Sequence, residues 1–304
     1  MSGGGAVSGV LAASDLDQTL VFSERSAGAD VAGLVPVEEY DGRTISWVTP
    51  AAWEVLGELV ASGAFVPVTT RTPEQYLRIR WPQRPPRLAV CANGGVLLVD
   101  GEPDEAWTAR VRRDLGGCAP LERVHARLTR VVGEARAAVP GSAEPAVRDV
   151  PGLFCYAVLR DGQRPALEGA LLGDLTVLLD GWGYAVSLQG RKLYAVPRPL
   201  TKSAAVAEVV RRGGFAGFVA AGDSLLDTDL LVAARAAVRP GHGELLRAGW
   251  DHPGVRLLEA AGAAAGEETA RWLLAAVRGT DRSARPAQKE CSGPGNVPAR
   301  TSSA

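Results

Sequence analysis

Residues 10–19 read VLAASDLDQT, a short apolar run that ends abruptly in two carboxylates. The run Val10–Ala13 is typical of a strand that is buried on both faces. Asp15 and Asp17 follow at its carboxyl end, which is where open α/β sheets place their ligand sites. By itself a D-x-D pair is more often a solvated turn, so its interpretation depends on the residues that accompany it.

Strand and helix signals alternate on either side of this run. Three further apolar runs are expected to be strands, namely Phe65–Val68, Leu88–Cys91 and Phe218–Ala221. Thr49-Pro50 starts and Gly63 ends a crossover helix, and Thr72 begins a second one with a capping box. We therefore expect an α/β fold with a doubly wound, Rossmann-like parallel sheet. Pro67 cannot donate a ladder hydrogen bond, so its strand could be bulged or less central.

The pattern changes between residues 96 and 196, where hairpin signals mix with two helical stretches. This is typical of a separate α+β unit inserted into the first domain. A helix Ser203–Arg212 and a last helix near Glu267–Val277 restore the α/β rhythm. The expected organisation is a flexible N-terminus 1–9, a core 10–95 and 197–278, an inserted cap domain 96–196, and a disordered tail 279–304.

Composition excludes several classes of protein. The chain has 304 residues, 46 % of them hydrophobic, which suffices for a sizeable core. Lys and Arg number 33 against 34 Asp and Glu, so no excess of positive charge favours nucleic acid. The four cysteines lack C-x-x-C spacing, which fits a reducing compartment. Without a signal-peptide pattern or a membrane-length apolar run, we expect a cytoplasmic protein with neither nucleic-acid nor membrane partners.

Polar groups at other strand and helix ends favour a functional role for the two carboxylates. Thr69 ends the second strand, Lys202 opens the helix after the insertion, and Asp223 and Asp227 follow a later strand. Together these residue types support phosphoryl transfer through an aspartyl-phosphate on Asp15. Mg²⁺ would bridge the nucleophile and the phosphate, which repel each other, and Asp223 and a backbone carbonyl would help to hold it.

The remaining roles follow from the same chemistry. Lys202 and the Thr69 hydroxyl would neutralise and orient the phosphate oxygens. Asp17 could protonate the leaving alcohol and then activate water. The expected metal ligands are Asp15, Asp17, Asp223 and Asp227. The expected substrate-binding residues include Thr19, Thr70 and Arg71. Arg71 could equally contact phosphate or pair with a carboxylate.

The order of these motifs resembles that of haloacid dehalogenase (HAD) superfamily phosphatases. D-x-D-x-T at Asp15, then Thr69, then Lys202, then G-D-x-x-x-D ending at Asp227 spans most of the chain. In receiver domains, which also combine acidic residues, Thr and Lys, the acidic residues all precede the Thr, whereas here an acidic motif comes last. The resemblance implies a Mg²⁺-dependent phosphatase whose cap closes over the substrate.

The position of the insertion refines the resemblance. An insertion between the Thr69 and Lys202 motifs is similar to a type-2 cap, and the segment containing Asn93 and Gly94 resembles one that precedes this cap in Cof-like and sucrose-phosphatase-like enzymes. The resemblance implies a sugar phosphate or a similar small phosphomonoester as substrate, with Asn93 and Gly94 near it. An ordinary turn at these two residues is the alternative.

Three residues depart from the family pattern. Gln18 and Thr70 stand where Gly is usual, and Leu226 replaces an Asn that usually helps to hold the phosphate or metal. Asp229 is expected to be a helix-start or surface carboxylate, and the histidines are expected to be structural or exposed. On the cap, Trp182, Tyr184, Arg191 and Lys192 are candidates for either specificity or packing.

Two alternatives to hydrolysis stay open at this point. A phosphomutase or phosphotransferase could use the same core and pass the phosphoryl group to another acceptor. A catalytically weak protein that senses a phosphorylated ligand is the second alternative, and Leu226 motivates it. The presence of both Asp15 and Asp17 favours an enzyme, because a sensor needs no nucleophile.

Overall fold

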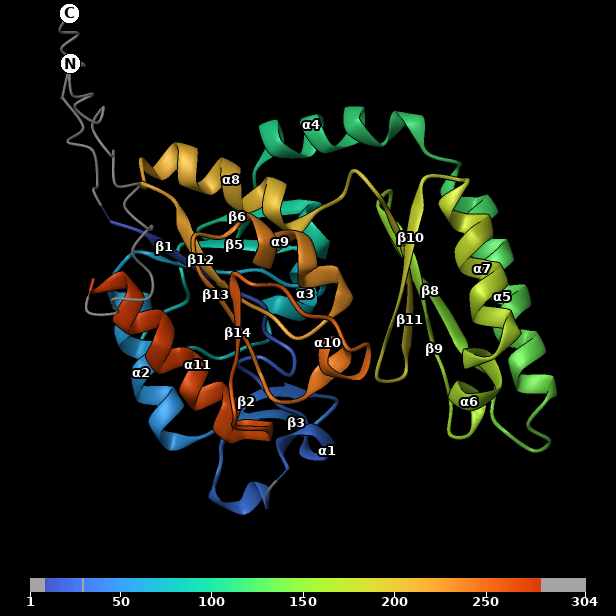
Figure 1. The fold of residues 1–304 in the computed structure, drawn as a ribbon, viewed down its shortest axis with the longest axis horizontal. Coiled ribbons are helices and arrows are strands. Elements are labelled where there is room, and N and C mark those ends of the chain that lie inside the picture. The colour runs from blue at the N-terminus through green and yellow to red at the C-terminus, as the bar shows by residue number, and fades with distance from the viewer. Residues whose placement is uncertain (1–8, 29, 280–304) are drawn as a thin grey trace, which may run out of the picture.

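The computed structural model describes residues 9–28 and 30–279, arranged as a core and a smaller lobe beside it (Figure 1). The core is built on a five-stranded parallel sheet in the order β14-β13-β12-β1-β4. Its strands are β1 (Leu11–Ser14), β4 (Phe65–Pro67), β12 (Phe218–Ala221), β13 (Ala237–Arg239) and β14 (Val255–Leu257). The α/β class with a parallel sheet is confirmed.

Helices cover both faces of this sheet because the buried strands alternate their side chains between two apolar layers. Leu11 and Ala13 of β1 pack in one layer and Ala12 in the other. The first layer is covered by α8 (Lys202–Gly213) and α9 (Thr228–Ala233), the second by α2 (Pro50–Ala61) and α11 (Gly262–Val277). The Thr49 hydroxyl caps α2 and Pro50 is its first residue, as expected.

The second crossover is shorter than the sequence indicates. The capping box at Thr72 is present, but α3 (Pro73–Tyr76) is a single turn. Pro67 is the last residue of β4, which is the edge strand of the five-stranded sheet. Val68 then forms an isolated parallel bridge to Val90. The missing donor of Pro67 is tolerated because the strand ends there.

Two antiparallel hairpins extend the core. The first, β2 (Val35–Tyr40) with β3 (Arg43–Val48), follows the short elements α1 (Glu24–Ala27) and η1 (Val31–Gly33). The second sheet contains β5 (Leu88–Cys91), β6 (Val96–Val99) and β7 (Glu102–Pro103), with η2 (Ala92–Gly94) in its turn. The remaining core elements are α4 (Glu105–Asp114), η3 (Leu115–Gly117), η4 (Leu225–Asp227) and α10 (Gly243–Arg247).

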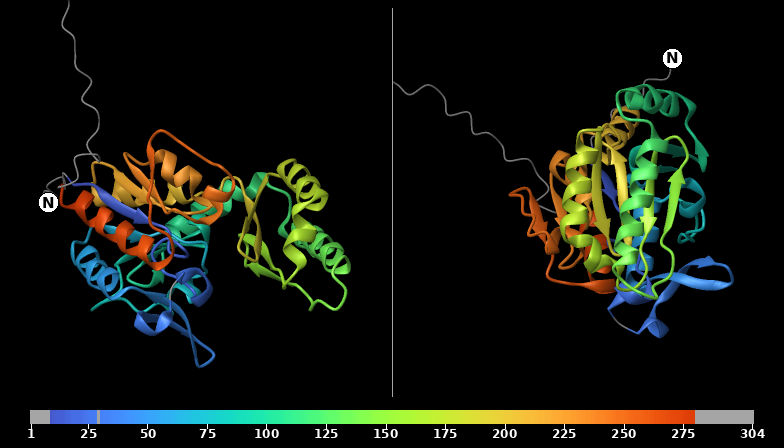
Figure 2. Two further views of the ribbon diagram at one scale, coloured as in Figure 1. Left: turned by 60° about the horizontal axis from the view of Figure 1, so that its bottom comes forward. Right: turned by 90° about the vertical axis from the view of Figure 1, so that its right-hand side faces the viewer.

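The smaller lobe, called the cap below, is an antiparallel sheet with helices on one side. Its sheet order is β10-β11-β9-β8, and Figure 1 shows α5 and α7 on the side of this sheet that faces away from the core. Its elements are α5 (Leu121–Ala137), β8 (Ala146–Val150), β9 (Phe154–Val158), α6 (Gln163–Glu168), α7 (Ala170–Asp180), β10 (Tyr184–Gln189) and β11 (Lys192–Pro197). The left view of Figure 2 also shows the cap beside the core.

The limits of the inserted unit stay a prediction. β6 pairs with β5 of the core, and Trp107 and Val111 of α4 pack in a core layer. Both observations favour a start after α4 rather than at residue 96. The flexible ends expected at 1–9 and 279–304 fall, for residues 1–8 and 280–304, outside the described residues. Within the described residues, no helix combines the length and apolar character that crossing a bilayer requires.

Candidate active site

The carboxyl ends of β1 and β12 bring together the first and last acidic motifs. β1 and β12 are parallel neighbours, so Asp15 and Asp223 leave the sheet at the same edge. Lys202, the first residue of α8, lies between two carboxylates: its Nζ donates to Asp15 Oδ1 at 2.6 Å and to Asp227 Oδ1 at 2.5 Å. All four side chains are buried. The structure therefore brings together residues that are about 200 positions apart in the sequence.

Crowding of three carboxylates around one ammonium group perturbs their titration. Burial raises the pKa of Asp15 to about 7; the charge of Lys202 opposes this rise, and those of Asp227 and Asp17 add to it. Burial, followed by the charges of Asp15 and Asp227, also raises the pKa of Asp223 well above its usual range. These shifts indicate that the cluster holds more negative charge than Lys202 alone balances.

The cluster fits a divalent cation. Oxygen atoms of Asp15, Asp223 and Asp227 lie within 4.8 Å of one another. Asp223 Oδ2 is buried and has no hydrogen-bond partner among the described residues. A hard cation such as Mg²⁺ takes oxygen ligands of this kind and would supply the missing partner. Gly243 is required beside it, because a Cβ there would lie 2.5 Å from Asp223 Oδ2.

Asp17 is not part of this cluster; its carboxylate instead forms a two-pronged ion pair with Arg71. Arg71 Nε donates to Asp17 Oδ2 and Arg71 Nη2 to Asp17 Oδ1, both at 2.8 Å. Desolvation by the surrounding protein raises the pKa of Asp17. The charge and hydrogen bonds of Arg71 outweigh this effect and hold the pKa of Asp17 well below its usual range. Of the two roles open for Arg71, the structure shows the pairing with a carboxylate.

Arg71 is itself anchored by a buried acid that the sequence analysis did not single out. Glu38 of β2 accepts hydrogen bonds from Arg71 Nη1 at 2.7 Å, from Arg78 Nε at 3.1 Å and from the Ser46 hydroxyl at 2.8 Å. The signal for this hairpin was Asp41-Gly42, a typical turn dipeptide between two strand-like runs. The burial of Glu38 has no comparable local signal.

The threonines differ in their contacts. Thr69 is buried, and its Oγ1 accepts a hydrogen bond from the Arg71 N–H at 3.1 Å. The Thr19 hydroxyl lies 3.4 Å from Asp15 Oδ2, so it contacts the carboxylate expected to be the nucleophile. Thr70 is half-buried, and its hydroxyl has no hydrogen-bond partner among the residues that the structure describes. Only Thr19 and Thr69 are thus tied to other site residues.

Asn93 and Gly94 connect the ends of β4 and β5 to the segment that leads into Lys202. The Asn93 N–H donates to the Thr69 carbonyl at 2.9 Å, and Asn93 Nδ2 donates to the Leu200 carbonyl at 2.9 Å. A Cβ on Gly94 would lie 2.2 Å from the Thr201 carbonyl oxygen. Both residues therefore hold motifs in place, and their contact with substrate stays a prediction.

The departures from the family pattern have structural counterparts. Gln18 adopts a left-handed φ of 62°, and His242 Nε2 hydrogen-bonds to its carbonyl oxygen at 2.7 Å. Leu226 packs in the apolar layer under α8 and α9, so it offers no polar group. Asp229 is half-buried in the first turn of α9, so of the two expectations the helix-start position is confirmed. Its carboxylate also accepts a hydrogen bond of 2.8 Å from the Ser203 N–H at the start of α8.

A second residue that the sequence analysis missed joins the two lobes. Glu244 of α10 is buried, and its carboxylate accepts hydrogen bonds from the Ser187 hydroxyl and the Leu188 N–H of the cap and from the Leu225 N–H of the core. Leu225 lies between Asp223 and Asp227, so Glu244 ties the cap to the loop that carries two of the clustered acids. No sequence pattern around Glu244 indicated this contact.

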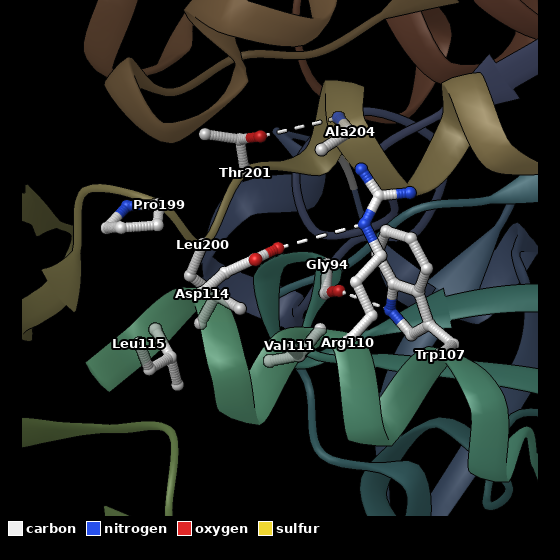
Figure 3. Close-up of a pocket in the computed structure, with 10 residues that line it drawn as sticks. All are labelled: Gly94, Trp107, Arg110, Val111, Asp114, Leu115, Pro199, Leu200, Thr201 and Ala204. Atoms are coloured by element: carbon white, nitrogen blue, oxygen red, sulfur yellow. Dashed lines mark hydrogen bonds and ion pairs between the residues drawn. The ribbon is translucent and has the colours of Figure 1, made fainter. Parts of the chain in front are cut away.

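A cavity lies beside α4, where the chain returns from the cap to the core (Figure 3). Trp107 Nε1 donates to the Gly94 carbonyl at 2.8 Å in its wall, and Arg110 pairs with Asp114 across one helical turn. The lining consists of Gly94, Trp107, Arg110, Val111, Asp114, Leu115, Pro199, Leu200, Thr201 and Ala204. None of the clustered carboxylates lines it, so this cavity belongs to the junction between the lobes.

Solved structures of phosphatases resemble this chain over most of its length. The sucrose-phosphatase of Synechocystis, solved with sucrose and phosphate, is 16 % identical with a TM-score of 0.53, covering 88 % of this chain and 98 % of that one. The trehalose-6-phosphate phosphatase C-terminal domain of C. albicans is 12 % identical with a TM-score of 0.55, covering 87 % and 91 %.

A third structure carries the superfamily name. It is a HAD superfamily phosphatase from Bacteroides thetaiotaomicron, 12 % identical with a TM-score of 0.50, and the match covers 91 % of this chain and 99 % of that one. Protein-family models give no match to the sequence, and no curated protein matches it. The fold defines an α/β protein with a capped parallel sheet. More particularly, it is the fold of the HAD superfamily phosphatases, so the fold that the motif resemblance implies is confirmed.

Proposed function

We propose that this protein is a Mg²⁺-dependent phosphomonoester hydrolase that works through an aspartyl-phosphate on Asp15. The observation that carries the proposal is the position of Asp15 at the end of β1, where Lys202 contacts one of its oxygens and two further buried acids lie beside it. A buried carboxylate whose charge is compensated by a lysine is suited to act as a nucleophile. The shared fold with phosphatases supports the same reaction.

In the first half-reaction, an Asp15 oxygen attacks phosphorus and the bond from phosphorus to the substrate alcohol breaks. Lys202 and the Thr69 hydroxyl would neutralise and orient the phosphate oxygens. In the second, water attacks the aspartyl-phosphate and releases inorganic phosphate and the Asp15 carboxylate. Asp15, Asp223 and Asp227 would hold Mg²⁺, which when bound supplies positive charge that offsets the repulsion between carboxylate and phosphate.

Asp17 is proposed to protonate the leaving alcohol and then to take a proton from water. In the structure it is paired with Arg71, and its lowered pKa keeps it ionised. Asp17 therefore has to leave Arg71, or to lose part of that contact, before it can hold the proton that the leaving oxygen needs. Arg71 is thus proposed to act on the proton transfer as a positioning residue.

The proposed substrate is a sugar phosphate or a similar small phosphomonoester. Sucrose-phosphatase and a trehalose-6-phosphate phosphatase are among the structures with the same fold, which favours a phosphorylated sugar.

Cys91, Cys118 and Cys155 are free thiols, in keeping with a reducing compartment such as the cytoplasm. A mutase or phosphotransferase differs only in the acceptor of the second half-reaction.

The test is phosphate release from p-nitrophenyl phosphate and a panel of sugar phosphates, with Mg²⁺ and with EDTA. Wild type, Asp15→Asn and the control Asp100→Asn, an exposed acid in a distant turn, are compared. Mg²⁺-dependent release that is absent only in Asp15→Asn supports the hydrolase. Turnover that appears only when an acceptor alcohol is added indicates a transferase. No release from any ester, with phosphorylated ligands still raising the melting temperature, would favour the sensor.

A further inference from the structure

The cap sheet presents one face to the core, and the strand register shows which side chains lie on it. Alternate residues of each strand share a face, and directly paired residues share it across the sheet. Tyr194 pairs with Tyr156, and both pack with the apolar layer of the core, whereas Leu193 and Ala195 pack with the cap helices. Lys192 lies two residues before Tyr194 on β11, so it too lies on the core-facing side.

The cap residues considered as specificity candidates separate on this criterion. Trp182 and Tyr184 pack with the cap helices, on the side away from the core. Arg191 is exposed in the turn between β10 and β11. Lys192 is the only one of the four that the register places on the core-facing side, and it is half-buried.

Lys192 belongs to the part of the cap sheet that is tied to the candidate active site. It pairs with Gln189 of β10, and the neighbouring Ser187 and Leu188 hydrogen-bond to Glu244, which also accepts the Leu225 N–H between Asp223 and Asp227. In keeping with this position, the charges of Tyr194 and Asp17 raise the pKa of Lys192. Its Nζ lies 6.0 Å from the centre of the Tyr156 ring, and the Tyr156 and Tyr194 rings are 5.5 Å apart. The ammonium group therefore lies over the Tyr156 ring, on the side of the cap sheet that faces the core.

The same face carries positive charge that no acid of the cap balances. In register with these residues lie Ser187, Gln189 and a second cation, Arg148, which pairs with Tyr156. By the strand alternation, none of the core-facing positions of the four strands is Asp or Glu. Neither Lys192 nor Arg148 forms an ion pair with any described residue. The face thus carries two cations without a salt-bridge partner among the described residues, of which Lys192 is half-buried and Arg148 is exposed.

We propose that Lys192 binds a second anionic group of the substrate, such as a carboxylate on the alcohol part, distinct from the phosphate that is cleaved. The inference rests on the proposed phosphatase function. It narrows the substrate class to phosphomonoesters whose alcohol part carries a carboxylate, for example phosphorylated sugar acids. Lys192 is partly desolvated and forms no ion pair with any described residue, so it favours an incoming anion, whereas a neutral sugar offers it no counter-charge.

The experiment compares two open-chain esters that differ at one end, where 6-phosphogluconate has a carboxylate and sorbitol 6-phosphate has a neutral hydroxymethyl group. Each is measured as a substrate and as a competitor of p-nitrophenyl phosphate hydrolysis, so an ester that binds without turnover still reports its affinity. The variants are Lys192→Met, Lys192→Arg and Arg191→Met, which removes an exposed positive charge one residue away. The ratio between the two esters is the readout, because any effect on Asp17 or on the cleaved phosphate cancels in it.

Wild type is expected to prefer the acidic ester, and Lys192→Met to lower that preference by about tenfold to a hundredfold, the range of one charged hydrogen bond. Lys192→Arg should retain most of the preference, and Arg191→Met all of it. An unchanged ratio in Lys192→Met, or an equal loss with both esters, overturns the inference and leaves the phosphatase intact. If wild type does not hydrolyse p-nitrophenyl phosphate with Mg²⁺, the proposed function fails, and this inference fails with it.

Discussion

The carboxylate of Glu244 in the core accepts a hydrogen bond of 2.9 Å from the hydroxyl of Ser187 in the cap. The same carboxylate accepts the N–H groups of Leu188 and Leu225, each within 3.0 Å. One buried side chain therefore serves donors from both lobes. The cap strand β10 and the loop between Asp223 and Asp227 are consequently fixed by a common acceptor.

Glu244→Ala is expected to leave two backbone N–H groups and one hydroxyl without their acceptor. The expected loss in the free energy of unfolding is about 2–4 kcal/mol, because unpaired buried donors are costly. Ser187→Ala removes only one of these bonds and should cost less. Urea denaturation of both variants beside Glu259→Ala, an exposed acid, provides the measurement. A Glu244→Ala variant as stable as that control would contradict the structural role.

Stability without metal should fall as the pH rises. The pKa of Asp15 is raised from its usual 3.8 to about 7, so between these values the folded protein binds a proton that the unfolded chain has lost. Such a group stabilises the folded state below pH 3.8, and that contribution is lost as the pH rises toward 7. Asp223 titrates in the same direction.

Added Mg²⁺ should therefore raise the melting temperature more at pH 8 than at pH 5, because at the higher pH it neutralises ionised carboxylates rather than competing with protons. Asp223→Asn should be more stable than wild type in EDTA at pH 8 and should lose most of the Mg²⁺ effect. Melting curves with EDTA, Mg²⁺ and Ca²⁺ test this. An increment from Mg²⁺ that does not depend on pH would argue against metal binding at the cluster.

Lys202→Met is expected to lower kcat for p-nitrophenyl phosphate by about 10²–10³, the usual effect of losing one preorganised charged donor. The side chain is fully buried between Asp15 and Asp227, so methionine fills the space but leaves both acids without their cation. Circular dichroism establishes whether the variant is folded. Turnover close to that of wild type in a folded variant would refute the role assigned to Lys202.

Arg71→Gln should move the Asp17 titration to higher pH. Arg71 lowers the pKa of Asp17, so its removal raises that pKa, and the limb of the pH–rate profile that reports Asp17 should shift upward. The pair also stabilises the fold above the usual carboxyl pKa, a contribution lost as the pH falls through the lowered one. Arg78→Gln is the control, because Arg78 contacts Glu38 but not Asp17. An identical profile in both variants would contradict the prediction.

Much of the core was predictable because its signals are local. The apolar strands that became β1, β5 and β12 lie within about one residue of their predicted limits, and the Thr49 and Thr72 caps are present. The strands β13 and β14 were not predicted, since three residues carry no usable periodicity. Likewise α4 was missed, because its charged surface leaves only Trp107 and Val111 buried.

By itself the sequence determined the identity and order of the reacting groups, since each of Asp15, Thr69, Lys202 and Asp223 lies next to a strand or helix end that local patterning reveals. Tertiary structure alone decided how these groups are paired. Three such relationships join elements distant in sequence: the ion pair of Asp17 with Arg71, the hydrogen bonds of Glu244 to both lobes and the position of Lys192 on the core-facing side of the cap. Such contacts depend on which faces of separate elements meet, and the residues around each position do not carry that information.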